Sequence, residues 1–170
     1  DGEVTLNISE EHFFPWSPDS PFLYDLTVGT TQGEEEGFDT VHSYFALRKW
    51  ECREDGRGIK RFFLNGKPIL LNGLLDQGYW PEGLYTPPSD GAVEHELHTV
   101  RELGFNLLRK HAKIEPERWY YHCDKLGIIV WQDMVNGGGV YPMWYVTYLT
   151  NALQPLLRYA PDLSLIHISE

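Results

Sequence analysis

The sequence has 170 residues, of which 42% are hydrophobic and 23% are charged, a composition typical of a folded protein rather than a disordered one. Its 25 acidic residues against 14 lysines and arginines give a formal net charge of −11, which argues against a nucleic acid as partner because such a surface repels phosphates. No stretch approaches the roughly 20 apolar residues that span a bilayer, so no membrane partner is expected, and the oligomeric state stays open.

The sequence contains no metal or redox motif. Its two cysteines, Cys52 and Cys123, are far apart and form no Cys-x-x-Cys pair, so they are too few for a disulfide framework or a zinc site. The sequence therefore predicts no metal and no cofactor. The first three residues lack the basic start and apolar centre of a signal peptide. We expect the natural N-terminus to be missing, which leaves bacterial cytoplasm, periplasm and secretion all open.

The pattern of residues 1–60 predicts β-structure. Alternating or apolar runs at 4–8, 22–28 and 41–47 are typical of strands. The acidic, Gly-flanked segment 29–39 between the last two runs is typical of a hairpin loop. Three strands are too few for a β-sandwich, so we expect residues 1–60 to be the C-terminal part of one.

A second hairpin is predicted at Asn65-Gly66, which lies between the apolar runs 61–64 and 69–71. Asn-Gly between apolar runs is a strong hairpin signal, because a type I′ turn needs positive φ at both central residues. The charged segment 51–60 before it is expected to be a linker or an exposed hairpin. This region is expected to lead into a new domain.

Two helices are predicted after the hairpin. Ser89 is a suitable N-cap for the first, whose apolar residues recur at helical spacing until Gly104 ends it. Pro116 lies near the first turn of the second helix, and Gly127 ends that helix.

Apolar strands are predicted at 105–109 and 128–131, around these helices. Alternating strands and helices with continuously apolar strands indicate a parallel sheet buried on both faces. A closed (β/α)₈ barrel needs about 250 residues, so only its first three units fit here, and no Gly-x-Gly-x-x-Gly supports a doubly wound sheet instead. The predicted fold is multidomain α and β, with the sandwich end in 1–60 and the N-terminal part of a TIM barrel in 61–163. Residues 164–170 continue no pattern and are expected to be a non-native tail.

In a parallel barrel, functional side chains gather at the C-terminal ends of the strands. This rule selects Asp76 after the first strand, Arg109 and His111 after the second, and Trp131 and Asp133 after the third. Carboxylate, guanidinium, imidazole and indole groups together suit a polyhydroxylated ligand, whose hydroxyls form hydrogen bonds while its C–H faces lie on aromatic rings.

Each of these residues also has a structural interpretation. Arg109 would pair with a carboxylate, His111 would belong to a loop, and Trp131 would belong to the core. Asn106, in the middle of a predicted strand, is expected to form structural hydrogen bonds that support the site. Asp76 and Asp133 leave a further alternative open: at a separation of roughly 10 Å, their carboxyl groups would suit an inverting hydrolase rather than a retaining one.

Four segments of the sequence resemble motifs of one enzyme family. Residues 16–24 resemble W-x-P-x-x-P-x-L-Y, and residues 63–68 resemble the L-N-G-K-P hairpin. Residues 103–109 and 123–133 resemble G-x-N-x-x-R and D-x-x-G-x-x-V-W. In this order the four segments are similar to glycoside hydrolase family 2, which contains β-galactosidases, β-glucuronidases and β-mannosidases.

The resemblance implies an immunoglobulin-like sandwich, a TIM barrel and a retaining mechanism with two glutamates. The acid/base follows an Asn after the fourth strand, and the nucleophile follows the seventh. The sequence has no Asn-Glu dipeptide, so both catalytic glutamates are expected downstream and this chain is expected to be inactive. Arg109 matches the motif arginine that orients the nucleophile. His111 follows it by two residues where the family has three, and Ala46 stands where the family prefers Gly.

The resemblance thus implies a fragment of a retaining exo-glycosidase that hydrolyses O-glycosyl bonds of terminal β-linked sugars in carbohydrate catabolism, with a carbohydrate substrate as its partner. The other hypothesis is a non-catalytic carbohydrate-binding or scaffold module. The alternation of strands and helices favours the enzyme, because binding sandwiches carry no parallel β/α units.

Overall fold

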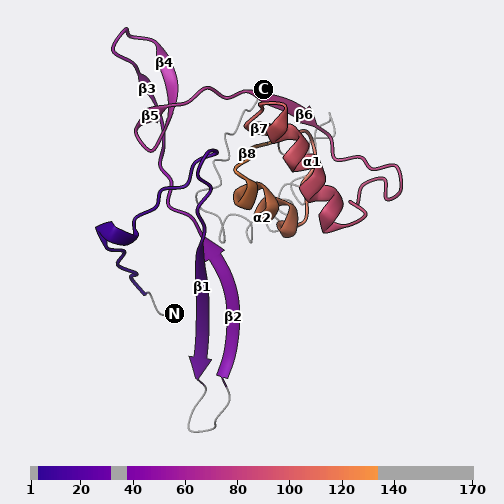
Figure 1. The fold of residues 1–170 in the computed structure, drawn as a ribbon, viewed down its shortest axis with the longest axis horizontal. Coiled ribbons are helices and arrows are strands. Elements are labelled where there is room, and N and C mark those ends of the chain that lie inside the picture. The colour runs from indigo at the N-terminus through magenta and orange to yellow at the C-terminus, as the bar shows by residue number, and fades with distance from the viewer. Residues whose placement is uncertain (1–3, 32–37, 134–170) are drawn as a thin grey trace, which may run out of the picture.

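The computed structural model describes residues 4–31 and 38–133, and it is a mixed α and β structure with three small sheets (Figure 1). After a short 3₁₀ turn at Glu10–His12, the elements in chain order are β1 (Tyr24–Thr31), β2 (Phe38–Phe45), β3 (Trp50–Glu54), β4 (Lys60–Leu64), β5 (Lys67–Pro68), β6 (Gly73–Asp76), α1 (Asp90–Glu102), β7 (Leu107–Lys110), α2 (Glu117–Leu126) and β8 (Ile129–Gln132). The expected end of the barrel segment, 134–163, and the expected tail, 164–170, lie outside the described residues.

Strands β1 and β2 form the long antiparallel hairpin seen in Figure 1. Tyr24 pairs with Phe45 at its open end, and their rings stack at a centroid distance of 4.9 Å. Two of the three strands predicted in residues 1–60 are thus confirmed. The strand predicted at 4–8 is wrong, because Val4 and Leu6 are 82% and 59% exposed and no described strand lies alongside to pair with them.

The sheet β3-β4-β5 contains the predicted Asn-Gly hairpin. Asn65 and Gly66 have φ values of 52° and 77°, as a type I′ turn requires. The returning strand β5 ends at Pro68, so the strand predicted at 69–71 does not form, although the Ile69 amide still donates to the Phe62 carbonyl at 3.0 Å. The charged segment 51–60 is an exposed hairpin rather than a linker, since β3 pairs with β4 across it. The expected domain boundary after residue 60 falls at the first residue of β4, and one sheet includes residues from both sides of it.

The C-terminal half has the predicted order of strand, helix, strand, helix and strand, with all three strands parallel in the order β6-β7-β8. The Ser89 hydroxyl accepts a hydrogen bond from the Ala92 amide at the start of α1, as predicted. Gly127 ends α2 in the left-handed conformation, with φ 76°. No described helix is long and apolar enough to span a bilayer.

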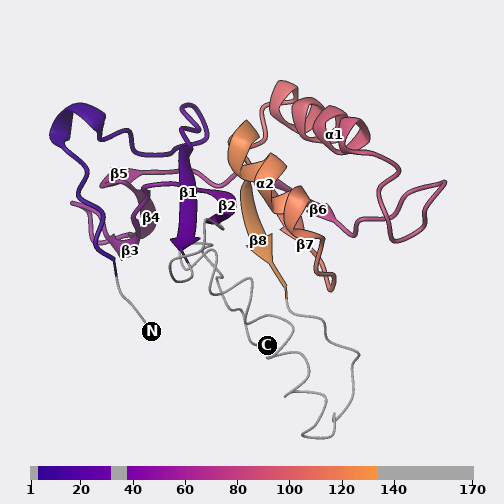
Figure 2. The same ribbon diagram turned by 90° about the horizontal axis from the view of Figure 1, so that it is seen from below.

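The register of this parallel sheet assigns its side chains to two faces, because successive side chains of a strand point in opposite directions. One face, here called the helix face, packs against α1 and α2 in one apolar cluster and includes Leu108 and Val130. The other, the far face, carries Leu107 and Ile129 in a second cluster with Trp16 and Leu64. Figure 2 shows both helices on the same side of the sheet. Further along the strands, Asp76, Lys110 and Gln132 form a row on the helix face, and Leu75, Arg109 and Trp131 form a row on the far face.

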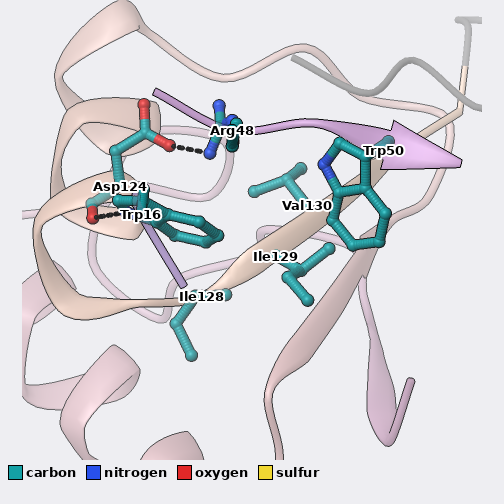
Figure 3. A pocket seen from close by; sticks show the side chains of 7 residues that line it. All are labelled: Trp16, Arg48, Trp50, Asp124, Ile128, Ile129 and Val130. Atoms are coloured by element: carbon teal, nitrogen blue, oxygen red, sulfur yellow. Dashed lines mark hydrogen bonds and ion pairs between the residues drawn. The ribbon is translucent and has the colours of Figure 1, made fainter. Parts of the chain in front are cut away.

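The N-terminal half docks onto the end of α2 around Trp16, which is fully buried. The Trp16 indole N–H donates to the Asp124 carbonyl at 2.7 Å, and the Asp124 carboxylate pairs with Arg48 at 3.0 Å (Figure 3). The Tyr44 hydroxyl also donates to this carboxylate, and burial together with the Asp124 charge raises the pKa of Tyr44. The cavity beside these groups is ≈ 10 Å³, about the space of one water molecule and far too small for a sugar. This contact region, here called the junction, is therefore structural.

Candidate functional site

The C-terminal edge of the far face carries a paired Arg109 and Asp133. The Arg109 Nε lies 3.1 Å from each carboxylate oxygen of Asp133, and its terminal nitrogen lies 3.0 Å from one of them. The Arg109 side chain is nevertheless 46% exposed, whereas that of Asp133 is 17% exposed. The carboxylate therefore fixes the orientation of a partly exposed guanidinium, a planar group that suits recognition of a hydroxyl or a carboxylate.

His111 and Trp131 lie at the same edge. The His111 Nδ1 accepts from the Gln77 amide nitrogen at 3.4 Å, which links the residues that follow β6 and β7. Trp131 packs partly against the far-face cluster that contains Trp16 and Leu64. Its position is therefore compatible with both the expected core role and the expected pocket role. Its indole N–H is buried and has no hydrogen-bond partner among the described residues. The register thus brings Arg109, His111, Trp131 and Asp133 to one edge, as the barrel rule predicts.

Asp76 lies on the other face. Both of its oxygens are engaged, one by the Gly78 amide at 2.7 Å and the other by the Lys110 ammonium. These contacts argue against the alternative in which Asp76 and Asp133 act as a catalytic acid and base. Residue 76 is in the row that faces the helices, whereas Asp133 pairs with the far-face arginine, so the two carboxylates do not converge on one substrate.

Asp76 belongs to a buried network of charges beneath the edge. The Lys110 ammonium contacts Glu115 at 2.9 Å and lies 4.1 Å from the Trp119 ring centroid, and Lys113 contacts the same Glu115 oxygen at 2.8 Å. The side chains of Lys110 and Glu115 are each 1% exposed. Two cations and two carboxylates balance in this network, as buried charges must.

Sequence reasoning missed Lys113 and Glu115 entirely. A Lys-x-Glu pair between a strand and a helix is typical of a solvated loop, and nothing local signals its burial. Two polar neighbours complete the network. The Tyr120 hydroxyl donates to the side-chain oxygen of Gln132 at 2.5 Å, and the side-chain amide of Gln132 donates to the backbone carbonyl of Lys113 at 2.7 Å. Burial raises the pKa of Tyr120, which keeps its hydroxyl a donor.

Asn106 lies at the opposite end of the sheet from the candidate site. It precedes β7, its side-chain carbonyl accepts from the Asn72 amide at 2.9 Å, and its amide donates to the Leu70 carbonyl at 2.9 Å. These bonds tie the segment before β6 to the start of β7. The structural role expected for Asn106 fits this geometry, and contact with a ligand at the C-terminal edge does not.

Glu96 on α1 provides a test of the electrostatics near the network. Its partial burial, followed by the nearby Asp76 charge, raises the pKa of this carboxyl above 4.5. A raised pKa means that the folded state disfavours the ionised form, so this group lowers stability as pH rises through the folded-state pKa. We expect Glu96→Gln to be more stable than the unmodified chain at pH 7, with the difference vanishing below pH 4.5. Urea unfolding at both pH values measures this, and a difference that does not depend on pH would contradict it.

Among residues 4–31 and 38–133, no three His, Cys, Asp or Glu side chains converge closely enough to hold a metal ion. The groups that the described residues bring to the edge are the Arg109 guanidinium, the His111 imidazole, the Trp131 indole and the Asp133 carboxylate that orients the arginine. These groups can bind and orient a polyhydroxylated molecule.

Several curated proteins that are similar to this chain in sequence are named as glycosidases. No protein-family model matches the chain. It is 27% identical over 148 residues to a β-galactosidase of Leuconostoc mesenteroides subsp. mesenteroides, which covers 86% of this chain and 14% of that protein. It is 28% identical to an exo-β-D-glucosaminidase of Streptomyces avermitilis, over 72% of this chain and 14% of that protein. A probable β-mannosidase of Caenorhabditis elegans is 29% identical, over 82% of this chain and 16% of that protein.

Solved structures of other proteins contain the same fold as this chain. A β-glucuronidase of Parabacteroides merdae superposes with a TM-score of 0.75 at 23% identity, covering 90% of this chain and 18% of that one. A GH2 β-galacturonidase of Eisenbergiella tayi superposes with a TM-score of 0.71 at 20% identity, covering 89% and 26%. The chain thus spans 14% of the length of the first curated relatives that it matches.

Proposed function

Because this chain is related to glycoside hydrolase family 2, we propose that it is part of a retaining exo-glycosidase that removes terminal β-linked sugars from carbohydrates. The relatives are named for galactoside, glucosaminide and mannoside hydrolysis, and a β-glycosidase activity is what they have in common. The observation that carries the proposal is the Arg109–Asp133 pair at the C-terminal edge of a parallel sheet, where enzymes of this architecture bind their substrates.

We propose that the β1–β2 hairpin and the sheet beside it are the end of an immunoglobulin-like sandwich, spanning residues 1–60. The three parallel strands and two helices would be the first β/α units of a TIM barrel, spanning residues 61–163. The similarity to a β-glucuronidase over 90% of the chain supports this arrangement. In a closed barrel the far face would point inward, so that Arg109 and Asp133 would line the mouth.

The proposed reaction is a double displacement. A carboxylic acid protonates the leaving oxygen while a carboxylate attacks the anomeric carbon, and water then hydrolyses the glycosyl-enzyme with net retention. Such a pair is about 5–5.5 Å apart, and the described residues of this chain place no two free carboxylates together at the edge. We assign both catalytic glutamates to sequence beyond this chain. Arg109, His111, Trp131 and Asp133 would bind and orient the terminal sugar.

The proposal is tested in the longest reading frame that contains this sequence. We expect that protein to hydrolyse a nitrophenyl β-galactoside, β-glucuronide, β-mannoside or β-glucosaminide with retention, as followed by NMR of the released anomer. Arg109→Ala should lower kcat/KM by about 10²–10³, the cost of removing a positioned donor. The 170-residue chain alone should be inactive.

A matched control is Arg118→Ala, which removes another exposed arginine paired with a carboxylate, at 2.8 Å from Asp90 between the first turns of α2 and α1. It should leave kcat/KM unchanged. Sugar binding without hydrolysis of any of the four substrates would instead support the carbohydrate-binding module. Equal losses in Arg109→Ala and Arg118→Ala would remove Arg109 from the site.

A further inference from the structure

An exposed pair of tyrosines, Tyr79 and Tyr85, lies in the loop that follows β6. Their ring centroids are 4.8 Å apart at an interplanar angle of 88°, and the Tyr79 hydroxyl donates to the Tyr85 hydroxyl at 3.2 Å. Tyr79 is 61% exposed and Tyr85 is 51% exposed. Two amphipathic rings therefore face solvent with their relative orientation already set.

The loop that carries these rings is held from beneath by Lys113. The Lys113 ammonium, almost fully buried, donates to the Gly78 and Tyr85 carbonyls at 2.7 Å each, so it ties together the two ends of the segment between them. It also pairs with Glu115 at 2.8 Å. These bonds fix the loop. They also occupy the Lys113 ammonium, so the loop surface carries no unpaired cation from this lysine. Rings that are fixed in advance lose little conformational entropy when a ligand binds.

The loop also lies next to the candidate site. Gln77, directly after β6, contacts His111 with its side chain, and Tyr79 follows it by two residues. The tyrosine pair therefore stands on the same C-terminal edge as the Arg109–Asp133 pair, on the neighbouring loop.

We propose that Tyr79 and Tyr85 form a platform for the second sugar ring of a β-linked substrate, on the leaving-group side of the bond that is cleaved. This inference rests on the proposed glycosidase function. An aromatic face packs against the C–H face of a pyranose, and the two phenol hydroxyls can exchange hydrogen bonds with sugar hydroxyls. A neutral sugar fits better than an anion, since the nearest cation is buried and already paired.

The test uses the 170-residue chain itself, labelled with ¹³C in its tyrosine rings and titrated with lactose and chitobiose and with galactose and glucosamine as single-ring probes. We expect both disaccharides to shift the Tyr79 and Tyr85 signals at lower concentrations than the single sugars do. Tyr79→Ala and Tyr85→Ala should each weaken binding by about tenfold, because each removes one of the two rings that contact the sugar. Tyr79→Phe, which keeps the ring, should bind within about threefold of the unmodified chain.

Tyr121→Ala is the matched control, because Tyr121 is an exposed tyrosine of α2 at 37% exposure. It should leave binding unchanged. An absence of ring shifts, equal responses to one and two sugar rings, or equal losses in all three alanine variants would each overturn the platform. Binding is measured here without catalysis, so a platform that binds disaccharide while the longer protein hydrolyses nothing would refute the proposed function alone.

Discussion

Replacing Lys110 with methionine is expected to lower the free energy of unfolding by about 3–5 kcal/mol, the usual cost of removing one partner from a buried ion pair. The ammonium is 1% exposed and contacts both Asp76 and Glu115. Methionine fills a similar volume, so the loss would come from electrostatics rather than from a cavity. Without Lys110, the carboxylates would be left with Lys113 as the one described cation in the network. Urea unfolding followed by tryptophan fluorescence measures the change.

Lys125→Met is the matched control. That lysine is 49% exposed and pairs with Glu94 at 3.3 Å, so its removal should cost less than about 1 kcal/mol. A triple variant of Lys110→Met, Asp76→Asn and Glu115→Gln should recover part of the stability lost in the single variant, because no uncompensated charge remains. Similar costs for the two lysine variants would show that the buried network does not stabilise the fold.

Gly127→Ala is expected to cost about 2–4 kcal/mol, which combines left-handed backbone strain with a steric collision. Gly127 has φ 76°, and a Cβ built there would lie 2.3 Å from the carbonyl oxygen of Pro18. The collision is with backbone, so it can be relieved only by moving the Trp16 segment away from α2. Thermal or urea unfolding measures the cost, and a red-shifted tryptophan emission would report the loosened junction.

The first helix supplies the control. Gly104 ends that helix region with φ 84°, and a Cβ there would meet nothing within 4 Å. Gly104→Ala therefore carries the backbone strain alone, about 1–2 kcal/mol. The difference between the two variants isolates the contact of Gly127 with Pro18. If both substitutions cost the same, the junction does not depend on this close approach.

The junction also changes the meaning of the sequence motifs. Trp16, Pro18, Asn65, Asp124 and Gly127 all come from segments that carry the family resemblance, and all of them meet there. The Asn65 amide donates to the Trp16 carbonyl at 2.9 Å, and the Asp124 carbonyl accepts from the Trp16 indole. Most of these motif residues therefore hold the two halves of the chain together. Arg109 and Trp131, by contrast, are motif residues that lie at the candidate site.

Interactions between residues close together in the sequence determine several local features of this fold. The Ser89 cap, the Asn65-Gly66 turn and the glycine ends of both helices follow from interactions within a few residues, and the alternation of strands and helices followed from hydrophobic patterning. The same patterning placed Arg109 and Asp133 at neighbouring strand ends. The strand predicted at residues 4–8 was wrong, because this strand-like pattern has no described neighbouring strand to pair with.

Only the tertiary structure decided what each polar residue does. Asp76 and Lys110 are 34 positions apart, and the strand register that joins them puts Asp76 on the helix face, away from Asp133. Lys113 and Glu115 are indistinguishable from solvated loop residues until α2 and the loop after β6 close over them. Burial and pairing of a charge depend on elements distant in sequence, whereas caps and turns depend on neighbours, and this difference in range divides what the sequence could predict from what it could not.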